Sequence, residues 1–471
     1  MENKQKKQFQ MPSAYSILIL IIIILAIVTQ FVGGDVKPAS LSQVMLAPTN
    51  GFIDAIDVCV FILVLGGFLG VMTKTGALDE GIATIVRKLK GKEELLIPIL
   101  MTLFSLGGTT YGMAEETMAF YALLVTTMIA AGFDAMVGAS VILLGAGVGV
   151  LGSTVNPFAI SAAIDALQGS NPDIQVNQTI ILGVGALLWL SSLVVAIIYV
   201  MSYAKKVKAD SGKSILSAVE RANSVEAYGK AGEEEETKLT GSQKVALIIF
   251  AIAFIIMIIS LIPWASFGVN MPGWTAVLTG QVLGDWYFQE LQAWFLIGAI
   301  IIGVSSRLGE REIVNSFVAG SADMVGVVLV IAVSRGISVI MSTTGLDAYV
   351  LQHASNALSN VSPALFTVGS YIVYLGLSFL IPSTSGLAAA SMPTFGGLAY
   401  SIGLSPEIMI LIFSAACGLV NLVTPTSAVV MGGLQIAKIE WPTWCKFVGK
   451  LLGIIFVMNV VILSIAMMIC K

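Results

Sequence analysis

An adjacent pair of acids, Glu115 and Glu116, and a single arginine, Arg335, stand within otherwise apolar stretches of the sequence. Charged groups are costly inside a bilayer, so these residues are candidates for a functional site. Two carboxylates against one guanidinium favour a zwitterionic substrate with an additional cationic group, whereas a dicarboxylate would need an excess of positive charge. Capping of a helix N-terminus by the acids and a structural ion pair for Arg335 stay open as alternatives. Asp57 and Asp323 lie near span ends and are expected at the membrane interface.

The composition is typical of a polytopic membrane protein. Of the 471 residues, 57% are hydrophobic and 11% are charged, and the mean hydropathy is +0.93. A soluble domain has about 25% charged residues. Apolar runs of about 20 residues, long enough to cross a hydrocarbon layer of ~30 Å, recur from residue 13 to residue 470. We therefore expect an all-α protein of the cell membrane that forms one integral unit.

Several function classes are disfavoured by what the sequence contains. Four isolated cysteines and one histidine do not fit a disulfide framework, a zinc site or a Ser/His/Asp triad. The sequence has no phosphate-binding loop of a nucleotide-driven pump and no repeated pore filter of an ion channel. We expect a secondary transporter, with no enzymatic activity, no cofactor, no structural metal and no nucleic-acid partner.

The segment around the acid pair returns in the second half of the chain. Residues 106–117, LGGTTYGMAEET, align without a gap with residues 380–391, LIPSTSGLAAAS, in which two alanines replace the acids. Three further correspondences relate residues 67–76 to 336–345, Asp54 to Asp323, and residues 152–159 to 420–427. A scaffold that occurs twice, with acids that occur once, predicts a substrate site between two related halves.

The distribution of basic residues predicts the orientation of the chain. Cytoplasmic loops collect Lys and Arg, and a cytoplasmic N-terminus with an external C-terminus places every basic residue except Lys37, Arg335 and Lys471 on the inner side. The span that ends near Lys74 then runs inward, and its counterpart that ends near Gly345 runs outward. The two repeats are therefore expected to be inverted in the membrane.

Each half is expected to contain a re-entrant hairpin. Residues 95–107 would span roughly 20 Å as a helix, which is too short to cross the bilayer. A turn at Gly107–Gly108 is expected to send the chain back, and Pro382 and Gly386 are expected to turn the second hairpin from the opposite side. Irregular backbone at this depth must be buried in protein or line a cavity, so the two tips should meet near the midplane.

Each hairpin is followed by a predicted broken helix, since Pro157 and Pro425 each remove a backbone N–H and clash with the preceding turn. The resulting half-helix N-termini suit an anionic group. Oxygens at the breaks suit a polar substrate group or a small cation such as Na⁺, and they belong to Ser153, Thr154, Asn156, Asn421 and Thr424. Packing kinks with self-satisfied hydroxyls are the alternative.

These elements give two halves and one predicted substrate site. The first half, residues 1–204, is expected to contain hairpin 95–131, broken helix 134–167 and span 179–204. Residues 205–244 form the linker between the halves. The second half, residues 245–471, is expected to contain hairpin 363–400 and broken helix 404–436. The acidic run 233–236 is expected to be solvated linker. The predicted site comprises Thr109, Thr110, Tyr111, Gly112, Glu115, Glu116, Ser153, Thr154, Asn156, Pro157, Arg335, Ser383, Thr384, Ser385, Gly386, Asn421, Thr424 and Thr426.

Residues 107–121, 153–159, 379–386 and 421–427 carry a family resemblance. They resemble the motifs of the YfcC-like basic amino acid antiporters, which are related to anaerobic dicarboxylate carriers, and the likeness covers nearly the whole chain. The resemblance implies the ion-transporter-superfamily fold with elevator-type movement, a homodimer, and exchange of amino acids such as arginine and ornithine. Cation-coupled transport of dicarboxylates or other carboxylates stays the alternative, and a coupling ion stays open.

Overall fold

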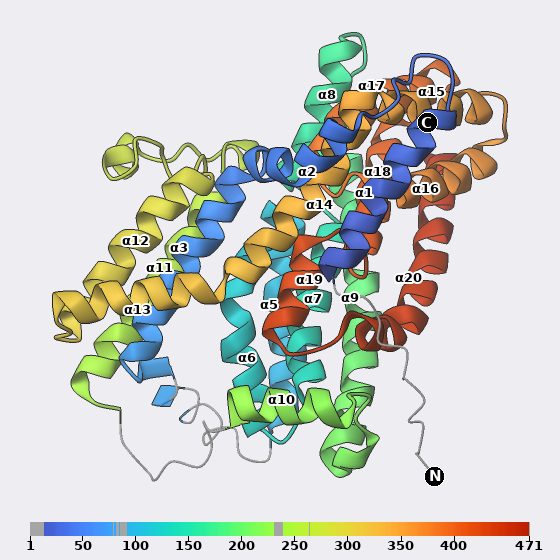
Figure 1. Cartoon of the computed structure of the whole chain (residues 1–471). Coiled ribbons are helices and arrows are strands. Elements are labelled where there is room, and N and C mark those ends of the chain that lie inside the picture. Colours follow the sequence, from blue (N-terminus) through green and yellow to red (C-terminus); the bar gives the residue numbers. More distant parts are fainter. Residues whose placement is uncertain are drawn as a thin grey trace, which may run out of the picture.

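The computed structural model is helical throughout the part of the chain that it describes, residues 14–470 without 79, 82–83, 85–91, 230–238 and 263 (Figure 1). Among these residues, eight helices are long and apolar enough to cross a membrane. The protein is therefore a multi-pass membrane protein, in agreement with its composition. The acidic run 233–236 lies outside the described residues.

The helices of the first half precede a short linker helix. They are α1 (Ala14–Phe31), α2 (Leu41–Asp54), α3 (Ile56–Lys74), α5 (Leu96–Tyr111), α6 (Met118–Ala130), α7 (Ala135–Leu151), α8 (Ala162–Ser170), α9 (Gln178–Ala209) and the linker helix α10 (Ala218–Tyr228). Those of the second half are α11 (Gly241–Leu261), α12 (Phe288–Ser305), α13 (Glu310–Asp323), α14 (Val325–Thr344), α15 (Leu346–Leu358), α16 (Pro363–Leu380), α17 (Thr384–Ser401), α18 (Pro406–Val420), α19 (Ala428–Ile436) and α20 (Trp441–Ile469).

Two helix crossings are built on glycine. Helix α2 packs on α14, and α13 packs on α3 (Figure 1). A Cβ atom at Gly51 would lie 2.2 Å from the carbonyl oxygen of Ala332, and one at Gly320 would lie 2.2 Å from the carbonyl oxygen of Gly66. Gly51 stands three residues before the C-terminal residue of α2, as Gly320 does in α13. Small residues allow such close backbone contact between membrane helices, so equivalent positions of the two halves make the same kind of crossing.

The predicted turn at Gly107–Gly108 is wrong. Helix α5 continues through both glycines to Tyr111, and the chain turns at Gly112, which ends the helix with a φ of 77°. A Cβ atom at Gly108 would lie 2.2 Å from the carbonyl oxygen of Ala146 in α7. The glycine pair therefore serves close packing of α5 on α7, and the turn falls at the glycine that adopts a left-handed conformation.

The matched segment of the second half turns earlier in the alignment. Helix α16 ends at Leu380, and α17 begins at Thr384 after a short connection that contains Pro382. Gly386 is already helical, which differs from its expected place in the turn. Its N–H donates to Ser383 Oγ at 3.2 Å, so Ser383 caps α17 and starts the helix before Gly386.

Both prolines that were expected to break helices lie in interruptions. Helix α7 ends at Leu151, and a π-helical turn, η3 (Pro157–Ser161), leads into α8. Helix α18 ends at Val420, and α19 begins only at Ala428. At each interruption one helix ends and another begins, so terminal N–H and C=O groups without intrahelical partners lie between the two pieces.

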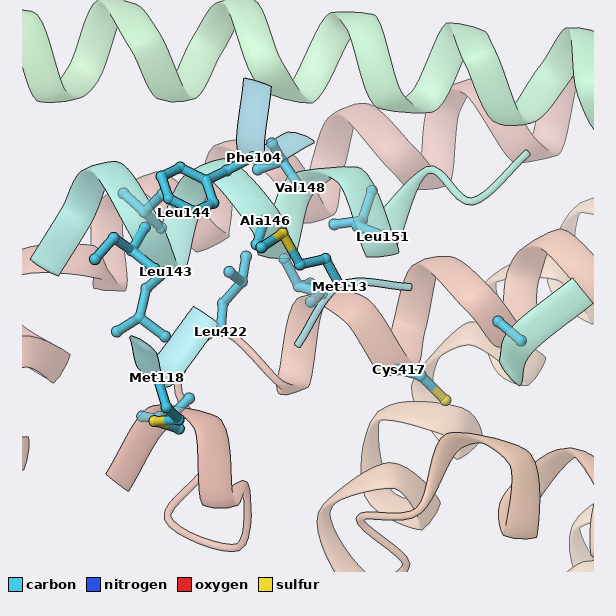
Figure 2. Packing of buried hydrophobic residues seen from close by; sticks show 14 of the residues in the cluster. Phe104, Met113, Met118, Leu143, Leu144, Ala146, Val148, Leu151, Cys417 and Leu422 are labelled. Carbon is cyan, nitrogen blue, oxygen red and sulfur yellow. The ribbon is translucent and has the colours of Figure 1, made fainter. Parts of the chain in front are cut away.

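The core around α7 packs tightly against the turn after α5 and the interruption after α18. Figure 2 shows Met113 beside α7, together with Leu422 from the interruption after α18. A Cβ atom at Gly147 would lie 2.2 Å from Leu422 Cδ2, and the α7 residues Leu144, Val148 and Leu151 are buried. The turn after α5 and the interruption after α18 are thus held against the same helix.

The linker helix α10 lies across the end of the bundle at which α9 ends and α20 begins, and the C-terminal end of α20 lies at the opposite face (Figure 1). Buried Glu220 accepts a hydrogen bond from the backbone N–H of Glu440 at 2.9 Å. The Tyr228 hydroxyl donates to the carbonyl oxygen of Ile436 at 2.6 Å. Burial, and then the negative charge of Asp323, raise the pKa of Tyr228 to about 12, so this donor keeps its proton. The linker up to residue 229 is therefore packed structure.

Candidate functional site

A cavity of about 370 Å³ lies where the turn after α5, the start of α17, the two interruptions and α14 come together. Eleven predicted site residues line it: Gly112, Glu115, Glu116, Asn156, Arg335, Ser383, Thr384, Ser385, Gly386, Asn421 and Thr426. Both helix-turn-helix tips therefore border one space. Because they come from matched segments far apart in the sequence, this cavity is the candidate substrate site.

The other predicted residues do not line the cavity. They are Thr109, Thr110, Tyr111, Ser153, Thr154, Pro157 and Thr424. Thr109 Oγ1 donates to the carbonyl oxygen of Gly152 at 2.7 Å, and the backbone N–H of Thr154 donates to the carbonyl oxygen of Thr109 at 2.9 Å. These bonds join the end of α5 to the interruption after α7. Thr109 and Thr154 thus position the cavity wall and leave ligand contacts to their neighbours.

The two acids of the pair differ in exposure and bonding. Glu116 is 3% exposed, and its Oε2 accepts a hydrogen bond from the backbone N–H of Ala114 at 3.0 Å. Glu115 is partly exposed in the same short 3₁₀ turn, η2 (Glu115–Thr117). The capping alternative therefore holds for one oxygen of Glu116, whereas Glu115 is the more accessible carboxylate.

Arg335 faces the same cavity from α14 and has an acidic neighbour that the sequence did not assign. Its Nη1 lies 3.9 Å from Oδ2 of Asp54, which is at the end of α2. Asp54 and Asp57 both line the cavity, although the sequence did not select either residue for the site. The bend between α2 and α3 at Ala55 brings the two aspartates to the wall. Four carboxylates and one guanidinium therefore surround the space.

The oxygens that were considered for a small cation are divided between the cavity and its supports. Asn156 lines the cavity, but its Oδ1 accepts from the backbone N–H of Phe158 at 2.9 Å, and its Nδ2 donates to Ser153 Oγ at 3.0 Å. Thr424 Oγ1 lies 2.7 Å from Thr426 Oγ1. In contrast, Asn421 Oδ1 is buried and makes no hydrogen bond within the described chain. Asn421 thus brings a buried acceptor without a partner in the described chain to the cavity wall.

The sequence of the chain matches a known protein family. The family model described as DcuC, C4-dicarboxylate anaerobic carrier, matches residues 36–468. The chain belongs to this family. The match includes both tips, both interruptions and Arg335, so the whole candidate site lies within the family region.

Two individual proteins are also similar to this chain in sequence. An uncharacterised Haemophilus influenzae protein is 32% identical over 90% of this chain and 78% of its own length. An Escherichia coli K12 protein, YfcC, named provisionally as a basic amino acid antiporter, is 27% identical over 92% of this chain and 82% of its own length. The resemblance to YfcC-like proteins is therefore confirmed.

Two solved structures align with this chain over almost its whole length. The YdaH transporter of Alcanivorax borkumensis covers 96% of this chain and 98% of its own at 14% identity and a TM-score of 0.48. The MtrF efflux pump of Neisseria gonorrhoeae covers 98% and 96% at 16% identity and a TM-score of 0.45. Both TM-scores lie below 0.5, and the family assignment rests on the sequence matches.

Aromatic residues of this family member complete the wall and were not predicted. Phe158 of η3, Tyr287 before α12 and Phe288 at its start all line the cavity. The sequence did show a segment rich in aromatic residues, 264–292, which lacks Lys and Arg. Nothing in that pattern indicates which ring turns inward, because the return of the chain from α11 to α12 decides it.

Proposed function

We propose that the protein is a secondary transporter that exchanges basic amino acids, such as arginine and ornithine, through this cavity. The proposal rests on the balance of charge in the cavity wall. Four carboxylates line the cavity together with a single guanidinium, that of Arg335; they belong to Asp54, Asp57, Glu115 and Glu116. A site with excess carboxylates stabilises a cation and repels a second anionic group. The same balance disfavours a dicarboxylate, the substrate named in the family description.

The site offers partners for both ends of such a substrate. Glu115 is the accessible carboxylate for the cationic side chain, and Arg335 can bind a carboxylate through two parallel hydrogen bonds. Helix α19 begins at the cavity, and no side chain caps its N-terminus. Free N–H groups of this kind favour an anion. The name given to the relative YfcC agrees with this assignment.

We further propose an elevator movement of two inverted repeats. One group, the frame, consists of α1–α3 and α11–α14, and a second group, the core unit, consists of α5–α9 and α16–α20. The reciprocal crossings of α2 on α14 and α13 on α3 support the repeat, and the helix-turn-helix pairs α5–α6 and α16–α17 act as re-entrant hairpins. The frame supplies Asp54, Asp57 and Arg335 to the cavity, and the core unit supplies Glu115 and Glu116. A site at the junction of the two groups can be exposed alternately as one group slides.

The proposed orientation places the α10 face in the cytoplasm and the C-terminus outside. Basic residues near that face pair with acids of neighbouring segments: Lys74 with Glu312 at 3.9 Å and Lys208 with Glu93 at 2.8 Å. The positive-inside rule, applied to the basic residues near this face, supports the orientation. The proposal includes the homodimer that the family resemblance implies.

Transport by the purified protein in liposomes tests the proposed function. Labelled arginine, lysine, succinate and acetate are offered to vesicles with and without a basic amino acid inside, and protein-free vesicles are the control. We expect arginine and lysine uptake that depends on the internal amino acid. Succinate uptake with no uptake or binding of arginine or lysine would refute the proposal.

A further inference from the structure

Two aromatic rings from distant segments meet on the cavity wall. Phe158 belongs to the π-helical turn after α7, and Tyr287 immediately precedes α12. Their ring centroids are 5.5 Å apart, with an interplanar angle of 44°. In the grouping given above, one ring belongs to the core unit and the other to the frame. The pair therefore spans the junction at which the charged residues also meet.

Both rings are held from their backbones. The N–H of Phe158 donates to Asn156 Oδ1 at 2.9 Å, and the N–H of Tyr287 donates to Glu290 Oε2 at 2.8 Å. Phe288 supports Tyr287 from the side, with ring centroids 4.8 Å apart. Because the backbone bonds do not involve the rings, a ligand can use ring surface without breaking them.

The ring of Tyr287 has free surface next to the acids. Tyr287 is 47% exposed, whereas the adjoining Phe288 is 8% exposed. The phenol of Tyr287 lies within electrostatic reach of Glu115, Arg335, Glu116 and Asp57. The face of an aromatic ring carries negative charge density and attracts a cation within about 6 Å of its centre. Ring faces and carboxylates thus attract the same kind of group from different sides.

We propose that Phe158 and Tyr287 form an aromatic subsite that binds the cationic head group, guanidinium or ammonium, of a basic amino acid. This inference rests on the proposed function and assigns the end of the substrate that these rings recognise. The α-carboxylate is then directed toward Arg335. Because the subsite needs rings from both groups of helices, it is complete only when the core unit and the frame are arranged as in this structure.

Binding of arginine and citrulline to the purified full chain tests the subsite. Citrulline replaces the guanidinium with a neutral group of similar shape, so it reports packing without the charge. We expect Tyr287→Leu to weaken arginine binding about 2- to 30-fold, the range of a cation–π contact, and to change citrulline binding by less than about twofold. Tyr287→Phe keeps the ring and should retain arginine binding. Phe158→Leu provides an independent variant on the other segment, with the same expected selectivity.

The controls separate the subsite from folding and from the proposed function. Tyr400→Leu changes a tyrosine that is 52% exposed and lies outside the cavity, and it should leave binding of both ligands unchanged. Equal losses for arginine and citrulline in the Leu variants, or equal losses in Tyr287→Phe and Tyr287→Leu, overturn the subsite alone. If the wild type binds neither arginine nor lysine, the proposed function fails together with this inference.

Discussion

Three charged residues of the site, Glu115, Glu116 and Arg335, have no charged counterpart in the aligned segments of the other half. Glu115 and Glu116 correspond to Ala389 and Ala390 in the aligned segment of the second half. At the position that corresponds to Arg335, the first half has Gly66, where an added Cβ would lie 2.6 Å from the carbonyl oxygen of Gly320. One half thus uses the position for helix packing and the other half for charge. An asymmetric substrate, with a cation at one end and a carboxylate at the other, fits such an asymmetric site.

A comparison of three ligands assigns the two ends of the substrate. Agmatine lacks the α-carboxylate of arginine, and citrulline lacks its positive charge. Glu115→Gln should weaken arginine and agmatine about 10- to 150-fold, which corresponds to the 1.5–3 kcal/mol of a hydrogen bond to a charged group, and should leave citrulline nearly unchanged. Arg335→Gln should weaken arginine and citrulline by a similar factor and leave agmatine nearly unchanged. Calorimetric binding to the purified variants measures all six values.

The crossed pattern distinguishes recognition from a structural role. A purely structural Arg335, paired with Asp54 at 3.9 Å, would lower the affinity for all three ligands together when it is neutralised. Asp54→Asn serves as the matched control for that pair, since it removes the partner of Arg335 and leaves the guanidinium in the cavity. Uniform losses in Arg335→Gln and Asp54→Asn would contradict direct binding of the α-carboxylate.

The sequence revealed those site residues whose type is unusual for their surroundings. Glu115, Glu116 and Arg335 are charges in apolar segments, and each lines the cavity. Asp54, Asp57 and Tyr287 were not selected, because acids and aromatic rings are ordinary near the ends of membrane helices. Only the bends between α2 and α3 and before α12 turn them inward. Such bends depend on tertiary packing, which periodicity does not reveal.

At the scale of elements, glycine pairs set how closely helices approach. The sequence suggested a turn at Gly107–Gly108 because two glycines favour turns, but the same residues also permit contact between helix backbones. The packing of α7 against α5 decides between a turn and close helix contact. An added Cβ at Gly149 of α7 would lie 2.2 Å from the Ser105 carbonyl oxygen. A local pattern could not show this partner. The breaks at Pro157 and Pro425 were easier to place, since proline removes a donor whatever its neighbours are.

Substitution of Gly108 tests the packing of α5 on α7. Gly108→Ala should destabilise the protein by about 1–3 kcal/mol, the cost of overpacking, because the new methyl group would meet the Ala146 carbonyl oxygen at 2.2 Å. The measurement is thermal unfolding in detergent, followed by loss of the monodisperse peak in size-exclusion chromatography. Gly183→Ala is the matched control, since nothing lies within 4 Å of its added Cβ in α9. Equal stability of the two variants would show that the crossing tolerates a side chain.

For the whole molecule, the central question is whether the core unit moves against the frame. The cavity draws its charges from both groups, and contacts between α14 and α19 join them near the α10 face. An added Cβ at Gly326 in α14 would lie 2.4 Å from Nε2 of Gln435 in α19. In the elevator movement proposed above, the surfaces of the two groups slide past each other. The same contact would therefore have to break in every transport cycle.

A disulfide across this contact tests the movement. In a background in which the four cysteines, all free in the structure, are replaced, the pair Gly326→Cys and Gln435→Cys should stop exchange in liposomes after oxidation and regain it after reduction. The control pair, Gly396→Cys in α17 and Leu167→Cys in α8, joins two helices of the core unit, where an added Cβ at Gly396 would lie 2.8 Å from Leu167 Cδ1. Oxidation of that pair should leave exchange active, because both residues move together. Exchange that continues at full rate with the α14–α19 bond formed, as verified by gel mobility, would exclude the elevator movement proposed for this chain.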